Sequence, residues 1–436
     1  MENTQNQTGS VDAAFKRKVI EAHRKRGGKL EMIGKVTVST SEELSIYYTP
    51  GVALACMAIK EDKNQSYELT ARANTIAIIT DGTRILGLGN IGPEASMPVM
   101  EGKALLFKKY GGVDAVPIAI SVRGEDEIVN FVKAIAPSFG GINIEDIESP
   151  KVFNIVERLS RELDIPVLHD DRYGTGVVAL AGMINALKLV GKSLGSASIV
   201  INGAGSAGMG ITELLLEAGA RNIIMCDSNG AIYEGRQEGM NDTKGDISKR
   251  TNRNGLKGSL DDVISGADVL IGVSVKSKFT KELISKMAKD PIVFALSNPN
   301  PEMSYEEMLA SGVAIGATGR SNTPNQINNH LAFPGIMRGL LDSRTRRINP
   351  QMLIAASRAI ASSVPAKALS KEHIMPNFQE AGTRITANVA TAVFKAAIKT
   401  GAATIKREPK EVKKETIERL KRYSKMEKRL HLSENA

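Results

Sequence analysis

The stretch SIVINGAGSAG at residues 198–208 decides the fold of this chain. A β-branched run leads into glycines spaced G-x-G-x-x-G, and an amphipathic helical pattern follows. Such glycines permit a tight strand-to-helix turn, let the backbone approach a pyrophosphate, and let the helix pack closely on its strand. The helix N-terminus then offers backbone N–H groups to the phosphates. The pattern predicts a dinucleotide site at Gly203, Ala204, Gly205, Ser206, Ala207 and Gly208.

The next apolar run, residues 222–227, ends in Asp227. Dinucleotide folds place a carboxylate at this point, where it accepts hydrogen bonds from the adenosine ribose. The glycine motif alone also fits a plain strand–turn–helix, but here strand, helix, second strand and acid occur in the required order. Because a carboxylate repels a 2′-phosphate, Asp227 favours NAD. A neighbouring cation would offset that repulsion, so NADP stays open.

Length and composition indicate an ordinary globular protein. The chain has 436 residues, enough for two or three domains, with 42% hydrophobic and 24% charged residues. No apolar run approaches the roughly 20 residues of a membrane span, and the start MENTQNQ lacks the regions of a signal peptide. Cys56 and Cys226 lie in apolar patterns and are expected to be buried thiols. We therefore expect a cytoplasmic protein with no membrane partner.

The net charge of +9 raises the question of a nucleic-acid partner. Residues 405–431 contain eleven basic and five acidic residues and so carry six of these charges. The signs are mixed, however, and the same segment has an apolar stripe at helical spacing. We expect a solvated helix that docks on the body or on a second subunit, and no nucleic-acid partner. The stripe comprises Ile417, Leu420, Tyr423, Met426 and Leu430.

Short apolar runs alternate with helical patterns from residue 76 onward, which predicts an α/β fold. We expect two domains with mostly parallel sheets, the second a Rossmann-like dinucleotide-binding domain, followed by C-terminal helices. The boundaries are placed at residues 1–190, 191–345 and 346–436. The expected strands lie at residues 76–80, 113–120, 142–144, 165–168, 198–202, 222–227, 269–273, 292–296 and 313–317, and the main helices at 11–26, 96–110, 125–136, 150–163, 175–190, 351–363 and 378–399.

Acidic residues follow three of the expected strands, at residues 81, 145–146 and 170–171. Open α/β sheets bind ligands at the carboxyl ends of their strands. Adjacent carboxylates raise each other's pKa and need a cation nearby. Glu145, Asp146 and Asp171 would supply hard oxygen ligands for Mg²⁺ or Mn²⁺. The alternative is that some of them cap the helices that follow.

Four further polar residues have an ordinary structural explanation when taken from pattern alone. Lys103 sits in an apolar helical stretch, where a lysine usually extends its ammonium to solvent. Tyr48 precedes a Pro-Gly turn, where a tyrosine more often packs than reacts. Asn298 and Asn329 lie near turns that an asparagine could cap.

Taken together, these segments resemble the malic enzymes, and specifically their short form. They follow one another in family order and at family-like spacing over roughly residues 40–345, which makes the resemblance highly specific. The matching segments are YTPGVA at 48–53, DGTRILGLGNIGP at 81–93, MEGK at 100–103, NIEDI at 143–147, HDD at 169–171, the glycines of 203–208, ALSNP at 295–299, NN at 328–329 and FPG at 333–335.

The resemblance implies oxidative decarboxylation of L-malate to pyruvate and CO₂, with reduction of NAD(P)⁺ and a requirement for a divalent cation. It also implies decarboxylation of oxaloacetate, and a homodimer with N-terminal elements at the interface. Carried over to this chain, Lys103 is similar to the general base and Tyr48 to the general acid. A further hypothesis is that Asp170, beside Asp171, orients or tunes Lys103. Glu145, Asp146 and Asp171 look like metal ligands, Arg84 like a malate-carboxylate ligand, and Asn298 and Asn329 like residues at the nicotinamide and substrate.

One departure and two competing functions remain. The departure is at residues 172–176, where this chain has Arg-Tyr-Gly-Thr-Gly in place of the Gln-His-Gly-Thr-Ala common in short forms. The metal ligand Asp171 is kept, but we expect the neighbouring surface and the cofactor contacts to differ. The first competitor is another metal- and NAD-dependent dehydrogenase, or a non-redox decarboxylase, acting on a related 2-hydroxy or 2-oxo acid. Simple hydride transfer needs no acid at C3, so the pair Tyr48 and Lys103 disfavours it. A non-catalytic nucleotide sensor would be expected to have lost one of these residues, and this chain has them all.

Overall fold

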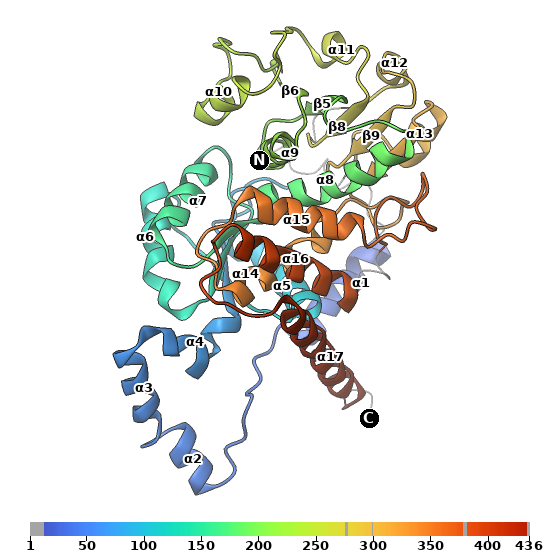
Figure 1. The fold of residues 1–436 in the computed structure, drawn as a ribbon. Coiled ribbons are helices and arrows are strands. Elements are labelled where there is room, and N and C mark those ends of the chain that lie inside the picture. The colour runs from blue at the N-terminus through green and yellow to red at the C-terminus, as the bar shows by residue number, and fades with distance from the viewer. Residues whose placement is uncertain (1–12, 275–277, 299, 378–381, 434–436) are drawn as a thin grey trace.

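Two mostly parallel sheets, each flanked by helices, form the body of the chain in a computed structural model (Figure 1). The structure describes residues 13–274, 278–298, 300–377 and 382–433, with side chains up to residue 429. The predicted α/β class, with a Rossmann-like second sheet and C-terminal helices, is confirmed. Among the described residues, no helix combines the length and apolarity that a membrane crossing requires.

The first sheet has four parallel strands in the order β2-β1-β3-β4. Its apolar side chains are buried between α5 (Pro93–Gly111), which packs on β1 and β2, and the paired helices α6 (Glu125–Ile135) and α7 (Lys151–Glu162). The carboxyl ends of β3 and β4 lie side by side and lead directly into the acidic segments. The strands are β1 (Thr75–Thr80), β2 (Asp114–Ala119), β3 (Gly141–Ile144) and β4 (Val167–His169).

The second sheet has six strands in the order β10-β9-β8-β5-β6-β7, parallel except for β7. The order reverses between β5 and β8, and open α/β sheets bind ligands at such a switch point. Short helices α10 (Asp242–Ser248), α11 (Leu260–Val263), α12 (Lys281–Ser285) and α13 (Tyr305–Ala310) connect its strands. The strands are β5 (Ser198–Asn202), β6 (Asn222–Asp227), β7 (Gly230–Ala231), β8 (Val269–Gly272), β9 (Ile292–Ala295) and β10 (Ile315–Thr318).

Helix α8 (Asp170–Leu189) joins the two sheets and packs along α9 (Ser206–Glu217). Two glycines permit this close approach, because a Cβ on Gly210 would lie 2.0 Å from the Arg172 carbonyl oxygen and one on Gly176 would lie 2.7 Å from that of Gly210. The Arg172 guanidinium also makes a bidentate pair with Glu213, with Nε 2.9 Å from Oε2. Arg172, the departure from the short-form pattern, therefore links α8 to α9.

Helix α8 begins five residues earlier than predicted. The predicted helix spans residues 175–190, whereas the observed one begins at Asp170. The acidic residues Asp170 and Asp171 form its first turn, where negative charge stabilises a helix. The helix therefore begins immediately after β4.

The C-terminal helices pack back onto the body of the chain. Helix α14 (Phe333–Ser343) packs on α5, α15 (Pro350–Ala361) on α8, and α16 (Thr383–Lys399) on both α14 and α15. The predicted start of α16, residues 378–381, lies outside the described residues.

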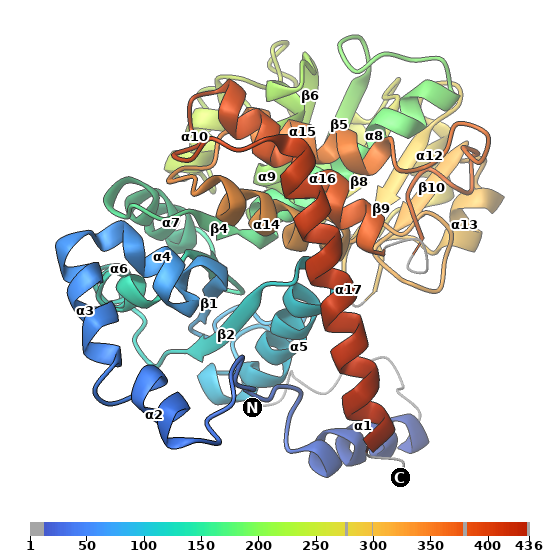
Figure 2. The same cartoon turned by 60° about the horizontal axis from the view of Figure 1, so that its bottom comes forward.

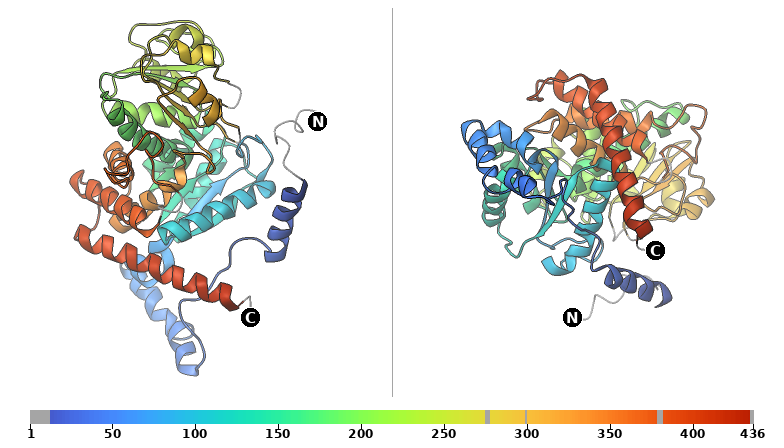
Figure 3. Two further views of the ribbon diagram at one scale, coloured as in Figure 1. Left: turned by 90° about the vertical axis from the view of Figure 1, so that its right-hand side faces the viewer. Right: turned by 90° about the horizontal axis from the view of Figure 1, so that it is seen from below.

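Helix α17 (Pro409–Ser433) packs on α16 and α5, with polar contacts to α5 as far as Glu427, and its end projects from the body (Figures 2 and 3). Its buried residues are Val412, Thr416 and Leu420. Of the predicted stripe, Tyr423 is half-buried with Lys108 of α5 over its ring, whereas Met426 is exposed, so the prediction was wrong at Met426; the Leu430 side chain lies outside the described residues. The helix leaves the body before its distal apolar residues find a surface to cover.

The N-terminal segment lies apart from this body. Helices α2 (Ser41–Tyr47), α3 (Val52–Glu61) and α4 (Ser66–Leu69) form a lobe that projects from the first sheet, and α1 (Ala13–Arg26) lies on an extended connection (Figures 1 and 3). These helices, described in full, bury none of their residues. Cys56 in α3 is consequently exposed rather than buried as predicted, whereas Cys226 in β6 is buried.

Candidate active site

Lys103, on α5, lies between two carboxylates at the carboxyl end of the first sheet. Its Nζ is 2.7 Å from Glu145 Oε1 and also donates to Asp170 Oδ2. The Lys103 side chain is 10% exposed and that of Asp170 is fully buried, so both charges are largely removed from water. Pattern alone suggested that the Lys103 side chain extends to solvent, and this was wrong. Helix α5 instead places its ammonium among carboxylates.

Three neighbours hold Lys103 and its two carboxylate partners in place. Asn329 Nδ2 donates to Asp170 Oδ2 over 2.6 Å, and Asn143 Nδ2 donates to Glu145 Oε2 over 2.8 Å. The Lys103 ammonium also lies 4.4 Å from the centre of the Phe333 ring, a cation–π geometry. Helices α5, α8 and α14 thus meet at one buried charge cluster.

The electrostatic balance at Lys103 differs from the expected one. Burial lowers the pKa of Lys103, but the carboxylates of Asp170 and Glu145 outweigh burial and raise that pKa well above its ordinary value. A general base must be neutral to accept a proton, which calls for a depressed pKa instead. The protein groups alone therefore keep Lys103 protonated, and loss of its proton requires additional positive charge in this pocket.

Glu145, Asp146 and Asp171 meet as predicted at the ends of β3 and β4. One carboxylate oxygen from each lies within 4.8 Å of the others. Asp146 has a left-handed backbone, with φ 51°, and its N–H donates to Asp171 Oδ2 over 3.1 Å. Burial and then the charges of Asp171 and Glu145 raise the pKa of Asp146 to about 9. Three mutually repelling carboxylates, two buried and that of Asp171 half-buried, fit a hard divalent cation, which would supply the missing positive charge.

Arg84 lies at the rim of this acidic group. Its backbone N–H donates to the Asp146 carbonyl over 3.1 Å, and its side chain is exposed. Burial raises the pKa of Asp171, while Lys103 and, more weakly, Arg84 lower it, which places the Arg84 charge within electrostatic reach of the cluster. Asp81, in contrast, is buried against Lys151 Nζ at 2.7 Å and serves as an internal ion pair.

Tyr48 is not brought to the cluster. It lies between α2 and α3, in the lobe that projects away from α5, and it is 67% exposed (Figures 1 and 2). Its assignment as the general acid therefore stays a prediction, and one that a single copy of the chain does not satisfy.

The glycine-rich turn between β5 and α9 has the geometry that its sequence predicts. Gly203 has φ +127°, a conformation that favours glycine. A Cβ on Gly208 would lie 1.8 Å from the Gly203 carbonyl oxygen, whereas a Cβ on Gly205 would meet nothing within 4 Å. The turn is thus closely packed on the protein side and open at Gly205, where a pyrophosphate would approach the N-terminus of α9. These residues fit a dinucleotide.

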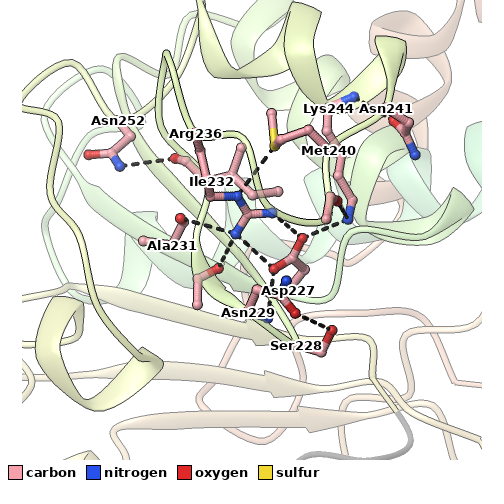
Figure 4. Close-up of polar contacts among 12 residues, drawn as sticks. Asp227, Ser228, Asn229, Ala231, Ile232, Arg236, Met240, Asn241, Lys244 and Asn252 are labelled. Carbon is pink, nitrogen blue, oxygen red and sulfur yellow. Dashed lines mark hydrogen bonds and ion pairs between the residues drawn. The ribbon is translucent and has the colours of Figure 1, made fainter.

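Asp227, at the end of β6, is surrounded by cations (Figure 4). Arg236 pairs with both of its oxygens, and Lys244 Nζ lies 2.6 Å from Oδ2. Burial raises the pKa of Asp227, but hydrogen bonds from Arg236 and Lys244 outweigh it and lower that pKa to about 2. The neighbouring cations that would offset repulsion of a 2′-phosphate are therefore present.

Asn298 follows β9 and is exposed, with its amide beside Gly319 near the end of β10. It lies on the same edge of the second sheet as the glycine-rich turn, because parallel strands share their carboxyl ends. Two site residues escaped the sequence analysis as individual candidates: Asn143, which orients Glu145, and Phe333, which covers Lys103. Only the FPG and NIEDI segments around them gave a signal.

Comparisons with known proteins agree with this geometry. A family model described as "Malic enzyme, NAD binding domain" matches residues 173–398, and one described as "Malic enzyme, N-terminal domain" matches residues 27–125. The chain is 52% identical to the bifunctional malic/malolactic enzyme of Bacillus subtilis, over 92% of this chain and 98% of that protein. It is also 52% identical to the NAD-dependent malic enzyme of Geobacillus stearothermophilus, over 86% of this chain and 78% of that protein.

A solved structure gives the same result at the level of the fold. The malic enzyme of Pyrococcus horikoshii is 44% identical and superposes with a TM-score of 0.90, covering 94% of this chain and 97% of the other. More distant relatives include an NADP-dependent malic enzyme of Rhizobium meliloti, 43% identical over 87% of this chain and 51% of that protein. By both its family models and its relatives, this chain belongs to the malic enzyme family.

Proposed function

We propose that this chain catalyses the oxidative decarboxylation of L-malate to pyruvate and CO₂, reduces NAD⁺ or NADP⁺, and requires Mg²⁺ or Mn²⁺. The observation that carries the proposal is Lys103, buried between Glu145 and Asp170 beside the three-carboxylate group. A simple dehydrogenase needs one base, whereas this pocket combines a base with a site for a cation. The same pocket would also decarboxylate oxaloacetate.

Lys103 is the proposed base that takes the proton from the malate 2-hydroxyl, and Asp170 and Asn329 keep its Nζ in place. Arg84 at the rim would bind a malate carboxylate, and Asn298 and Asn329 would contact the nicotinamide and substrate. After CO₂ leaves, C3 needs a proton, which Tyr48 would donate. Asp170, which contacts Lys103 rather than substrate, acts by positioning the base.

Glu145, Asp146 and Asp171 would hold the divalent cation. When bound, that cation lowers the pKa of a hydroxyl and stabilises the negative charge that decarboxylation leaves on oxygen. The turn at residues 203–208 would hold the coenzyme, whose nicotinamide accepts the hydride from C2. The carboxylates around Lys103 favour its protonated form. Lys103 can therefore act as a base only after the bound cation has added positive charge beside it.

We also propose a homodimer in which the N-terminal lobe packs on a second copy. The lobe exposes apolar side chains, among them Ile46, Leu54 and Met57, that a monomer leaves in water. Packing of this lobe on a partner would bring Tyr48 to the partner's Lys103 pocket. Mixing Tyr48→Phe and Lys103→Ala variants tests this directly, since shared sites restore activity in mixed dimers and unshared sites do not. A cytoplasmic location is proposed as well.

The test of the reaction is absorbance at the reduced-nicotinamide band, with L-malate, Mn²⁺ and NAD⁺ or NADP⁺. An EDTA control and a pyruvate assay run in parallel. Metal-dependent reduction with an equal amount of pyruvate supports the proposal. Reduction without pyruvate would identify a plain dehydrogenase instead, and no reduction with either coenzyme would favour a decarboxylase or a nucleotide sensor.

A further inference from the structure

The carboxylate of Asp227 has no acceptor capacity left for a ribose. Oδ1 accepts from Arg236 Nη1 and from the Asn229 N–H, each at 2.9 Å, and Oδ2 accepts from Arg236 Nη2 and from Lys244 Nζ (Figure 4). A carboxylate offers about four lone-pair positions. All four are engaged, so a ribose hydroxyl could bond to Asp227 only if one of its present donors moved away.

Arg236 is not the donor that can move. Its side chain is 5% exposed, and Nη1 also lies 3.3 Å from the carbonyl oxygens of Gly230 and Ala231. Nε lies 3.3 Å from Met240 Sδ. The guanidinium is thus fixed from several sides, and it neutralises Asp227 whether or not a coenzyme is present.

Lys244 is the movable partner. Its side chain is 16% exposed, and besides Asp227 its Nζ bonds to the Gly239 carbonyl at 2.6 Å. Its backbone is fixed, because Lys244 N donates to the Asn241 side chain that caps α10. A four-carbon stem on a fixed backbone can swing its ammonium outward by rotation of side-chain torsions alone. The exposed turn residues Ser228 and Asn229 adjoin the same position.

We propose that Lys244 binds the 2′-phosphate of NADP⁺ and that the Asp227–Arg236–Lys244 cluster makes this chain accept the 2′-phosphorylated coenzyme. This rests on the proposed use of a nicotinamide coenzyme. The three side chains sum to one positive charge, so a phosphate at the ribose 2′ position meets attraction where Asp227 alone would repel it. Lys244 exchanges one oxygen anion for another, while Arg236 continues to neutralise Asp227.

The test uses two adenosine fragments that differ only in the 2′-phosphate: adenosine 5′-monophosphate and adenosine 2′,5′-bisphosphate. Their binding to the full chain is measured by calorimetry. We expect the bisphosphate to bind more tightly, and Lys244→Gln to weaken it by on the order of tenfold, the value of one charge-assisted hydrogen bond. Adenosine 5′-monophosphate should bind this variant unchanged.

Two further variants separate recognition from folding. Lys244→Arg should retain tight binding of the bisphosphate, because the charge is kept. Lys249→Gln, which removes an exposed charge paired with Asp246 next to the same helix, should leave both fragments unaffected. Equal binding of the two fragments by the unaltered chain, or an equal loss of both in Lys244→Gln, overturns the proposal. Binding of adenosine 5′-monophosphate alone overturns it as well, whereas failure of both fragments to bind would overturn the coenzyme site itself, and with it the proposed reaction.

Discussion

Lys103 Nζ lies 4.4 Å from the centre of the Phe333 ring, so a residue from the C-terminal part of the chain covers the proposed base. The π face of an aromatic ring stabilises a cation by about 1–2 kcal/mol when water is excluded. The ring therefore favours the protonated form of Lys103, in the same sense as Asp170 and Glu145. It also keeps water from the side of the ammonium that the carboxylates do not cover.

Replacing Phe333 by Leu should lower the pKa of Lys103, because one source of cation stabilisation is lost. The acidic limb of the kcat/KM profile should move to lower pH by about 0.7 to 1.5 units. Phe107→Leu is the matched control, since the Phe107 ring packs on Phe333 at a tilt of 59°, with ring centroids 4.6 Å apart. Both variants lose a buried ring, so an equal shift in both would assign the effect to packing.

Replacing Lys103 by Ala should abolish malate oxidation and leave coenzyme binding intact. Loss of a general base typically costs on the order of 10² to 10⁴ in rate. Steady-state turnover and coenzyme titration are the two measurements. Lys108→Ala, on the same helix and paired with Asp114, should retain activity. Near-normal turnover of Lys103→Ala would remove Lys103 from the mechanism.

Added Mn²⁺ should raise the melting temperature of the unaltered chain, because the cation relieves repulsion among Glu145, Asp146 and Asp171 and binds only the folded state. Asp171→Asn should lose most of this rise. Glu148→Gln, an exposed acid close in sequence, is the control that should keep it. Thermal unfolding with Mn²⁺ and with EDTA decides the question, and an equal rise in all three proteins would show that the cation binds elsewhere.

Gly208→Ala should abolish coenzyme binding. The added Cβ would lie 1.8 Å from the Gly203 carbonyl oxygen, so the phosphate-binding turn must move. Gly245→Ala, in α10, meets nothing within 4 Å and should be neutral or stabilising by up to about 1 kcal/mol. Coenzyme titration of both variants is the measurement, and unimpaired binding by Gly208→Ala would contradict the assigned turn.

Stability should fall as pH decreases from about 6.5 to 4, in part through His330. Burial lowers the pKa of His330 from 6.5 to about 4. Between these values the unfolded chain binds a proton that the folded chain does not, so stability is lost as pH falls, by up to about 3 kcal/mol. Urea unfolding at several pH values across this range gives the free energy of unfolding as a function of pH. The slope of that plot should be smaller for His330→Gln than for the unaltered chain. An unchanged slope would exclude His330 as a contributor.

The sequence located the three acids proposed to bind the metal because their placement follows from local rules. Parallel strands bring their carboxyl ends to one edge, so acids that follow β3 and β4 had to meet. The glycine-rich turn was equally local, since strand, turn and helix are consecutive. The resemblance added the roles of Lys103 and Asp170, which pattern alone could not distinguish from ordinary surface and capping residues.

Other features depend on contacts between distant segments and could not be read from local pattern. Phe333 reaches Lys103 only because α14 packs on α5. The neutralisation of Asp227 depends on Arg236 and Lys244, whose positions follow from the loop after β7. The predicted start of α8 was five residues late, because the acidic residues after β4 were interpreted as a strand end and not as the first turn of the helix. The position of Tyr48 relative to Lys103 cannot be derived from one copy of the chain, because the proposed contact is made between two copies.

The glycine contact between α8 and α9 has a consequence for how the reactants are spaced. Asp171 lies in the first turn of α8, and the phosphate-binding turn leads into the first turn of α9. Because Gly210 lies against Arg172 with no room for a side chain, the two helix starts are held at one separation. The backbone contact between α8 and α9 therefore sets the distance between the proposed metal site and the proposed coenzyme site. That distance in turn sets how far the hydride would travel from carbon to carbon, and it is fixed before either reactant binds. Gly210→Ala would push the two helices apart and lengthen that distance, without altering any group that takes part in the proposed chemistry.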